Sequence, residues 1–247
     1  MRRARATSLL AAAALLTACG GPSDDGSTTV SVLAAASLTE AVTRLATAYE
    51  AEHPGARIEV SLGSSTTLAQ QIAQGADADV YAGAGADALE RLPAGFADGG
   101  GEDVLARNVL EIAVRPGNPE ALTGLADFAR TDLDTVLCAE TVPCGRAADE
   151  AFAAAGVVAA PASREVDVKA TVSKVALGEA DAAVVYRSDV VAAAGTVDGV
   201  VIPDEANVLV DYPIAWSNEG VHTVGFVDLL LGERGRQTLS ELGFSSR

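Results

Sequence analysis

Short apolar runs alternate with longer helical patterns along nearly the whole chain from residue 30 onwards. Runs such as 30–35 and 182–185 have the length and Val-rich content of buried strands, whereas 38–53 and 168–177 have the apolar spacing of helices that bury one face. This alternation is typical of parallel sheets covered by helices, so the sequence predicts an α/β fold. The expected strands are 30–35, 56–62, 78–82, 109–114, 134–139, 164–166, 182–185 and 208–214, and the expected helices are 38–53, 67–74, 86–91, 122–129, 146–155, 168–177, 221–232 and 233–242.

The beginning of the chain has the pattern of a signal peptide. Arginines precede an apolar stretch that is too short to span a bilayer, and small residues then lead to Cys19. This ending resembles the lipobox of bacterial lipoproteins, which implies a signal peptide at 1–18 and an acylated Cys19; an ordinary signal peptide is the alternative. The small polar residues of 19–28 indicate a flexible tether. We therefore expect a soluble body held by lipid on the outer face of the cell membrane, or located in the periplasm.

The chain is strongly acidic, with 34 Asp and Glu against 17 Lys and Arg and a net charge of −17. Such a field repels nucleic acid and anionic lipid, so neither is an expected partner, and membrane attachment is expected only through the lipid. The same field repels an anionic ligand at long range. Any anion site in this chain must therefore attract its ligand through local dipoles.

Small polar residues stand between several expected strands and the helices that follow them. Parallel sheets bind ligands beyond the carboxyl ends of their strands, where helix N-termini present unpaired NH groups and the positive end of the helix dipole. Several such junctions together describe a cleft that binds an anion without a cationic side chain. The junctions lie at Ser37, at Ser64 and Ser65, at Pro143-Cys144-Gly145, and at Asp167-Val168.

The same residues also fit ordinary structural roles. Ser37 and Glu40 have the spacing of a capping box, and Ser65 fits a plain helix cap. Val168 fits a core position, and Tyr186, which ends an apolar run, fits a half-buried position in a sheet. Taken singly, the residues leave both kinds of role open.

Two cysteines, Cys138 and Cys144, lie close together after an expected strand. In an oxidising exterior they can form a local disulfide, and free thiols are the alternative. A metal site is disfavoured because two cysteines without a nearby histidine make half of a zinc site at best. We therefore expect no metal ligands here.

The ordered motifs "AAASLTEA", "SSTTLAQQIAQGADADVYAGA", "VPCG", "VDVK" and "DAAVVYRSD" resemble the molybdate-binding proteins of bacterial ABC importers. The resemblance runs over about 30–244 and implies a two-lobed periplasmic binding protein of type II, in which each lobe is a mixed, mainly parallel sheet flanked by helices. Lobe one is then expected at 29–107 with 212–247, and lobe two at 108–211.

The resemblance also implies a site, an activity and partners. The protein is expected to be a monomeric binding protein and not an enzyme, without a cofactor, that captures molybdate or tungstate and delivers it to a membrane permease and its ATPase. Molybdate is a dianion that accepts hydrogen bonds and donates none, so its site needs donors only. The implied ligand-binding residues are Ser37 and Ser65 through hydroxyl and amide, Cys144 and Val168 through their amides, and Tyr186 through its hydroxyl.

The sequence departs from the family pattern at Cys144, where Ala is expected, and at Thr66, where a third Ser is common. Because the role at Cys144 is that of an amide, the change costs little unless a disulfide reshapes the turn. Lys169 lies next to Val168, but we do not assign it a ligand contact. Together these departures leave the implied donor set intact.

Two other functions compete with molybdate capture. Sulfate has the same charge and shape, and cavity size would distinguish the two anions. A nucleotide-binding enzyme is suggested by Gly83-Ala84-Gly85-Ala86-Asp87-Ala88, which fits G-x-G-x-x-A, but this motif alone is weak and does not follow the first expected strand.

Overall fold

The computed structural model describes residues 28–245. The expected signal peptide, Cys19 and the tether up to residue 27 lie outside the described residues. Within 28–245, no helix combines the length and the apolar character needed to cross a membrane.

The strands form a 9-stranded sheet in the order β2-β1-β3-β9-β4-β7-β5-β6, with β8 paired to β4. The pairs β1–β2, β1–β3, β5–β6 and β5–β7 are parallel, whereas every pair that involves β4 or β9 is antiparallel. The sheet is therefore mixed, as expected. The strands are β1 (Thr28–Ala35), β2 (Ala56–Gly63), β3 (Val80–Ala82), β4 (Gly101–Val114), β5 (Thr135–Cys138), β6 (Ser163–Glu165), β7 (Ala182–Tyr186), β8 (Asp198–Val201) and β9 (Leu209–Trp216).

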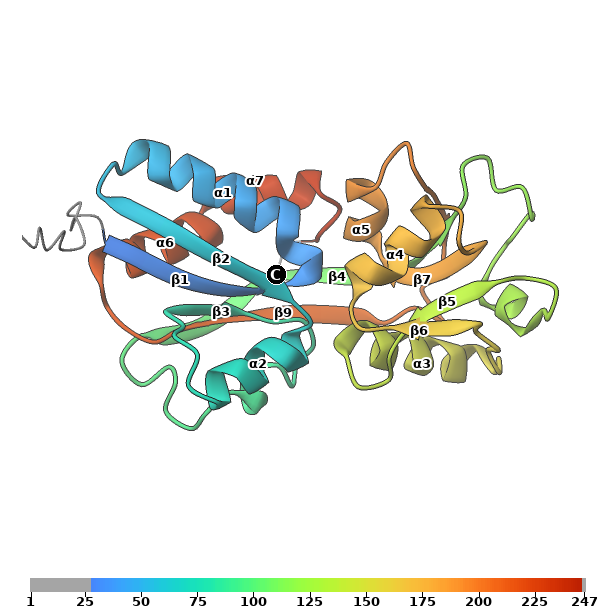
Figure 1. The fold of residues 1–247 in the computed structure, drawn as a ribbon, viewed down its shortest axis with the longest axis horizontal. Helices are drawn as coiled ribbons and strands as arrows, with labels where there is room; N and C mark the ends of the chain where they lie inside the picture. Colours follow the sequence, from blue (N-terminus) through green and yellow to red (C-terminus); the bar gives the residue numbers. More distant parts are fainter. Residues whose placement is uncertain (1–27, 246–247) are drawn as a thin grey trace, which may run out of the picture.

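Strand β4 joins two groups of strands, which Figure 1 shows side by side along the molecule. It pairs with β9 from Gly101 to Val109, with β7 from Leu110 to Val114, and with β8 from Glu111 to Val114. The chain returns through β9, and the side chains of Arg107 and Asp211 form an ion pair across the two strands at 2.8 Å. The two groups are thus connected through one continuous antiparallel ribbon.

Helices cover both faces of each group (Figure 1). In the first group α1, α6 and α7 lie on one face and α2 on the other; in the second group α4 and α5 lie opposite α3. The helices are α1 (Thr39–Glu52), α2 (Ser65–Ala73), α3 (Pro143–Ala155), α4 (Val168–Ala176), α5 (Arg187–Ala192), α6 (Val221–Leu231) and α7 (Glu233–Glu241), with 3₁₀ turns η1 (Ala36–Leu38), η2 (Leu89–Arg91) and η3 (Leu125–Ala129).

The largest difference from the sequence prediction is the length of β4, which begins at Gly101 and not near residue 109. Its glycine-rich start has the composition of a loop, but glycine is required there because Trp216 of β9 packs against the backbone. A Cβ atom on Gly100 would lie 2.3 Å from the carbonyl oxygen of Trp216, and one on Gly101 would lie 2.6 Å from its ring. Glycine is therefore required here for the close approach of β4 and β9, and not for a turn.

Smaller differences concern short elements. The helices expected at 86–91 and 122–129 are shorter 3₁₀ turns, and the sequence analysis did not predict β8 or α5. Helix α5 follows β7 without a loop, and its 6 residues are too few to give a helical pattern in the sequence. The other expected elements are present to within a few residues.

A disulfide joins Cys138, the last residue of β5, to Cys144 in the first turn of α3. Both cysteines are buried. The crosslink holds the start of α3 against the end of the strand that precedes it. It therefore fixes the turn that carries the amide of Cys144.

Reduction of this disulfide should lower the free energy of unfolding. The bond closes a short loop with a sequence separation of 6, for which loop-closure entropy gives about 2 kcal/mol. Urea unfolding with and without dithiothreitol measures the change, and the Cys138→Ala/Cys144→Ala variant should not respond to the reductant. Equal free energies for the native chain in both conditions would contradict the prediction.

Candidate ligand-binding site

All of the predicted ligand-binding residues line one small cavity between the two groups of strands. Its volume of about 20 Å³ admits only a compact solute, because pockets for organic ligands and cofactors usually exceed about 300 Å³. The lining residues are Ala35, Ala36, Ser37, Gly63, Ser64, Ser65, Ala84, Val142, Pro143, Cys144, Asp167, Val168 and Tyr186.

Three α-helices begin at this cavity. Ser65 is the first residue of α2, Val168 is the first residue of α4, and Cys144 lies in the first turn of α3 behind Pro143. The first NH groups of a helix have no acceptor within the helix, and they carry the positive end of its dipole. The cavity therefore lies where the amides predicted to bind the ligand are available.

Ser37 does not form the capping box that its spacing from Glu40 suggested. It lies within η1, and the N-cap of α1 is Leu38, which makes no side-chain capping bond. The Ser37 hydroxyl lies 2.8 Å from the hydroxyl of Tyr212 in β9, and the carboxylate of Glu40 binds Lys169. Because a hydroxyl can accept one bond and donate another, Ser37 can accept from Tyr212 and still donate into the cavity.

Ser64 and Ser65 differ in their partners. The Ser65 hydroxyl accepts a hydrogen bond from the NH of Ala84 at 2.9 Å, and its carbonyl accepts one from the hydroxyl of Tyr81 at 3.0 Å. Ser64 is the N-cap of α2, yet its buried hydroxyl neither caps the helix nor has another partner among the described residues. The sequence placed Ser64 at this junction, but only Ser65 was predicted to bind the ligand. The position of Ser64 just before the expected helix was the signal that could have identified it.

Tyr186 ends β7 and is buried at the cavity. Its hydroxyl has no hydrogen-bond partner among the described residues. Burial, with the nearby Asp189, raises the pKa of this hydroxyl far above its ordinary value, so the group keeps its proton. Tyr186 is therefore a neutral donor whose hydroxyl has no hydrogen-bond partner among residues 28–245.

Asp167 is the only charged residue that lines the cavity within the described chain. Its carboxylate accepts a hydrogen bond from the NH of Ala170 at 2.8 Å and caps α4. That role holds the start of the helix, and with it the amide of Val168, in position. The remaining polar groups at the cavity are hydroxyls and amides, which suits a ligand that only accepts hydrogen bonds.

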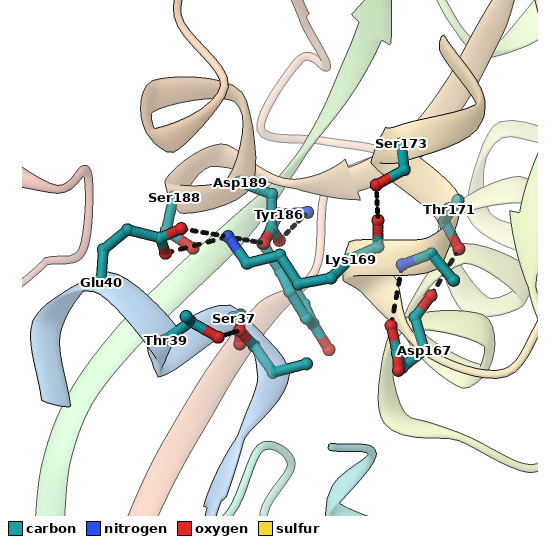
Figure 2. Close-up of polar contacts among 12 residues, drawn as sticks. Ser37, Thr39, Glu40, Asp167, Lys169, Thr171, Ser173, Tyr186, Ser188 and Asp189 are labelled. Carbon is teal, nitrogen blue, oxygen red and sulfur yellow. Dashed lines mark hydrogen bonds and ion pairs between the residues drawn. The ribbon is translucent and has the colours of Figure 1, made fainter. Parts of the chain in front are cut away.

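Lys169 does not line the cavity. Its ammonium group donates to both carboxylate oxygens of Glu40 at 2.9 Å and lies 3.5 Å from a carboxylate oxygen of Asp189 (Figure 2). Asp189 is fully buried, and burial raises its pKa to about 7 in spite of the lysine, which acts in the opposite direction. The positive charge of Lys169 is therefore paired with the carboxylates of Glu40 and Asp189.

The glycine motif of 83–88 does not form a dinucleotide-binding turn. Turns and the short η2 follow β3, so the motif opens no helix of the length that a pyrophosphate site uses. A Cβ atom on Gly83 would lie 2.5 Å from the Cβ atom of Ala88, which shows that glycine serves close packing there. The NH of Ala84 instead supports Ser65 at the cavity.

Comparisons with known proteins agree with this geometry. The family described as bacterial extracellular solute-binding protein matches residues 30–245. The molybdate-binding protein ModA of Mycobacterium tuberculosis is 33% identical over 242 residues, which are 93% of this chain and 92% of that protein. A putative ABC transporter substrate-binding lipoprotein of Bacillus subtilis, YvgL, is 27% identical over 84% of this chain and 82% of its own length.

A solved structure shows the same fold. The periplasmic molybdate-binding protein of Azotobacter vinelandii superposes with a TM-score of 0.74 at 19% identity, covering 88% of this chain and 99% of that one. The expected fold class is confirmed, and membership of a solute-binding family confirms a binding protein and not an enzyme. The chain belongs to the molybdate-binding ModA family of bacterial extracellular solute-binding proteins.

Proposed function

We propose that the protein is the solute-binding component of an ABC importer, which captures molybdate or tungstate in the cavity described above. The observation that carries this proposal is the donor set. Hydroxyls and helix N-termini converge on a space for a compact solute, and the one carboxylate that lines it among residues 28–245 is engaged as a helix cap. A fully deprotonated tetrahedral dianion satisfies such a site without a donor of its own.

Local dipoles provide the attraction that the net charge of −17 opposes. Hydrogen bonds to a charged acceptor are strong, and the small buried cavity lowers the effective dielectric around them. The donors proposed for the ligand are Ser37, Ser65, Cys144, Val168 and Tyr186, and we add the hydroxyl of Ser64, which has no partner among the described residues.

We further propose that two lobes close around the ligand, with 29–107 and 212–247 in lobe one and 108–211 in lobe two. The change of partner along β4 between Val109 and Leu110 supports a boundary there. Ser37 and Ser65 then belong to lobe one, and Cys144, Val168 and Tyr186 to lobe two. Closure would bring both donor groups onto the ligand and present an occupied form to the permease.

For the location, we propose that an acylated Cys19 attaches the protein, as a monomer, to the outer face of the membrane. The family is extracellular, and the similarity to a putative lipoprotein of Bacillus subtilis supports attachment. The permease and its ATPase are the proposed macromolecular partners.

Calorimetry with a panel of anions tests the ligand. Molybdate and tungstate should bind with a Kd of about 1 μM or lower, and sulfate should bind much more weakly because the smaller anion leaves some donors too far away. Phosphate should also bind weakly, because its remaining proton would face donors in the cavity. Equal or tighter binding of sulfate would contradict the assignment to molybdate.

Tyr186→Phe should separate ligand binding from stability. The lost hydroxyl has no partner among the described residues, so the melting temperature of the ligand-free protein should not fall. Affinity for molybdate should fall about tenfold or more, as expected for a hydrogen bond to a charged acceptor. Tyr49→Phe, which removes a hydroxyl bonded to His222, is the matched control and should keep the affinity. Unchanged binding by Tyr186→Phe would exclude this hydroxyl from the site.

Ser64→Ala and Ser65→Ala should differ in their effect on stability. Ser65→Ala removes the acceptor of the Ala84 NH, so the ligand-free protein should lose about 1–3 kcal/mol of unfolding free energy. Ser64→Ala removes a hydroxyl that has no partner within residues 28–245 and should leave that free energy nearly unchanged. Both variants should bind molybdate more weakly. If Ser64→Ala binds as tightly as the native chain, Ser64 is not a ligand donor.

A further inference from the structure

The ammonium group of Lys169 lies between the carboxylates of Glu40 and Asp189 (Figure 2). Lys169 lies in α4 and Asp189 in α5, both on the second group of strands, whereas Glu40 lies in α1 on the first group. The lysine nitrogen is 2.9 Å from both carboxylate oxygens of Glu40 and 3.5 Å from Asp189. One cation is thus shared by carboxylates from both sides.

Each member of this cluster is linked to a residue at the cavity. Lys169 directly follows Val168, and Glu40 lies one helical turn after Ser37. Asp189 accepts a hydrogen bond from the backbone NH of Tyr186 at 3.3 Å. A movement that separates Lys169 from Glu40 would therefore also separate Val168 and Tyr186 from Ser37.

Another polar contact between the two groups is built differently. Arg146 of α3 reaches Asp87 at 3.2 Å, but Asp87 also pairs with Arg91 of its own group at 2.6 Å. Among residues 28–245, the only cation that pairs with Glu40 is Lys169. Glu40 therefore gains its ionic partner only when the two groups are together.

Asp189 keeps the lysine in place on its own side. The Asp189 side chain is fully buried, and burial makes its charge costly without a nearby cation. Two carboxylates surround the lysine, so its charge is compensated and is not directed at an anion in the cavity. Its available role is to hold α4 and α5 against α1.

We propose that Lys169 is a positioning residue that, by pairing with Glu40, holds the lobes closed around the ligand and slows its release. This inference rests on the proposed function, because it assigns the ion pair a role in retaining the captured oxyanion. The pair lies beside the cavity and not in it, so it should affect the lifetime of the complex more than the encounter of protein and anion.

Glu40→Gln is the direct test, because it removes the charge and keeps the size of the side chain. Release of radiolabelled molybdate into excess unlabelled anion should become about two- to fivefold faster, the range expected for loss of a partly exposed ion pair, with little change in the association rate. Higher ionic strength should accelerate release from the native chain and have little effect on Glu40→Gln. The matched control is Glu52→Gln, on the same helix, whose partner Arg234 lies in α7 on the same group of strands; its release rate should equal that of the native chain.

A double-mutant cycle with Lys169→Met isolates the contribution of the Lys169–Glu40 ion pair to the release rate. Once Lys169 is replaced, adding Glu40→Gln should not accelerate release further, and Lys169→Arg should restore slow release. Because Lys169→Met also leaves Asp189 without its cation, urea unfolding of each variant identifies any general loss of stability. Additive effects on the release rate, or equal rates for Glu40→Gln and Glu52→Gln, would overturn the proposal.

Small-angle X-ray scattering of the ligand-free protein keeps the two proposals separable. Glu40→Gln should have a larger radius of gyration than the native chain and Glu52→Gln, because its lobes separate more often. If the native chain binds none of the oxyanions, the proposed function fails, and the scattering comparison still decides whether the pair closes the lobes. An unchanged radius together with an unchanged release rate would refute the role of Lys169.

Discussion

The structure depends on the backbone pairing of β4 with β9, which carries the chain between its two groups of strands. Without that ribbon, each group would be a small α/β unit with its helix N-termini facing water. The pairing places these N-termini opposite one another, with a cavity of about 20 Å³ between them. It also explains the glycines at the start of β4, because any larger residue would collide with Trp216. The binding site is therefore a product of how two units are joined.

The site reconciles an acidic protein with an anionic ligand. The charge of the chain is fixed by carboxylates spread over its surface, and its long-range effect is screened by salt. Within the cavity, most lining residues are buried, so the short-range donors act at a lower effective dielectric, where they are stronger. The carboxylates nearest the site are engaged elsewhere: Asp167 caps α4, and Asp189 faces Lys169. An acidic surface and an anion site can therefore coexist in one chain.

Much of this arrangement could be predicted from the sequence, because strand and helix periods are local and polar residues at their junctions follow the rules of parallel sheets. The partners of individual side chains could not. Ser37 and Glu40 fit a capping box by spacing, but Tyr212 and Lys169, both distant in sequence, bind them instead. The glycines before β4 suggested a loop because their reason, Trp216, lies over a hundred residues later. Contacts between segments that are distant in sequence therefore determine the side-chain partners that local patterns cannot predict.

The bond between Ser37 and Tyr212 has a consequence for the connecting ribbon. Tyr212 belongs to β9, and either hydroxyl can be the donor in this contact. When Ser37 gives its proton to an anion, its oxygen can only accept, so Tyr212 must donate. Hydrogen bonds aligned in this way polarise and strengthen one another. An anion in the cavity would then fix Tyr212 as the donor, so that the orientation of one hydroxyl on the connecting ribbon depends on the ligand.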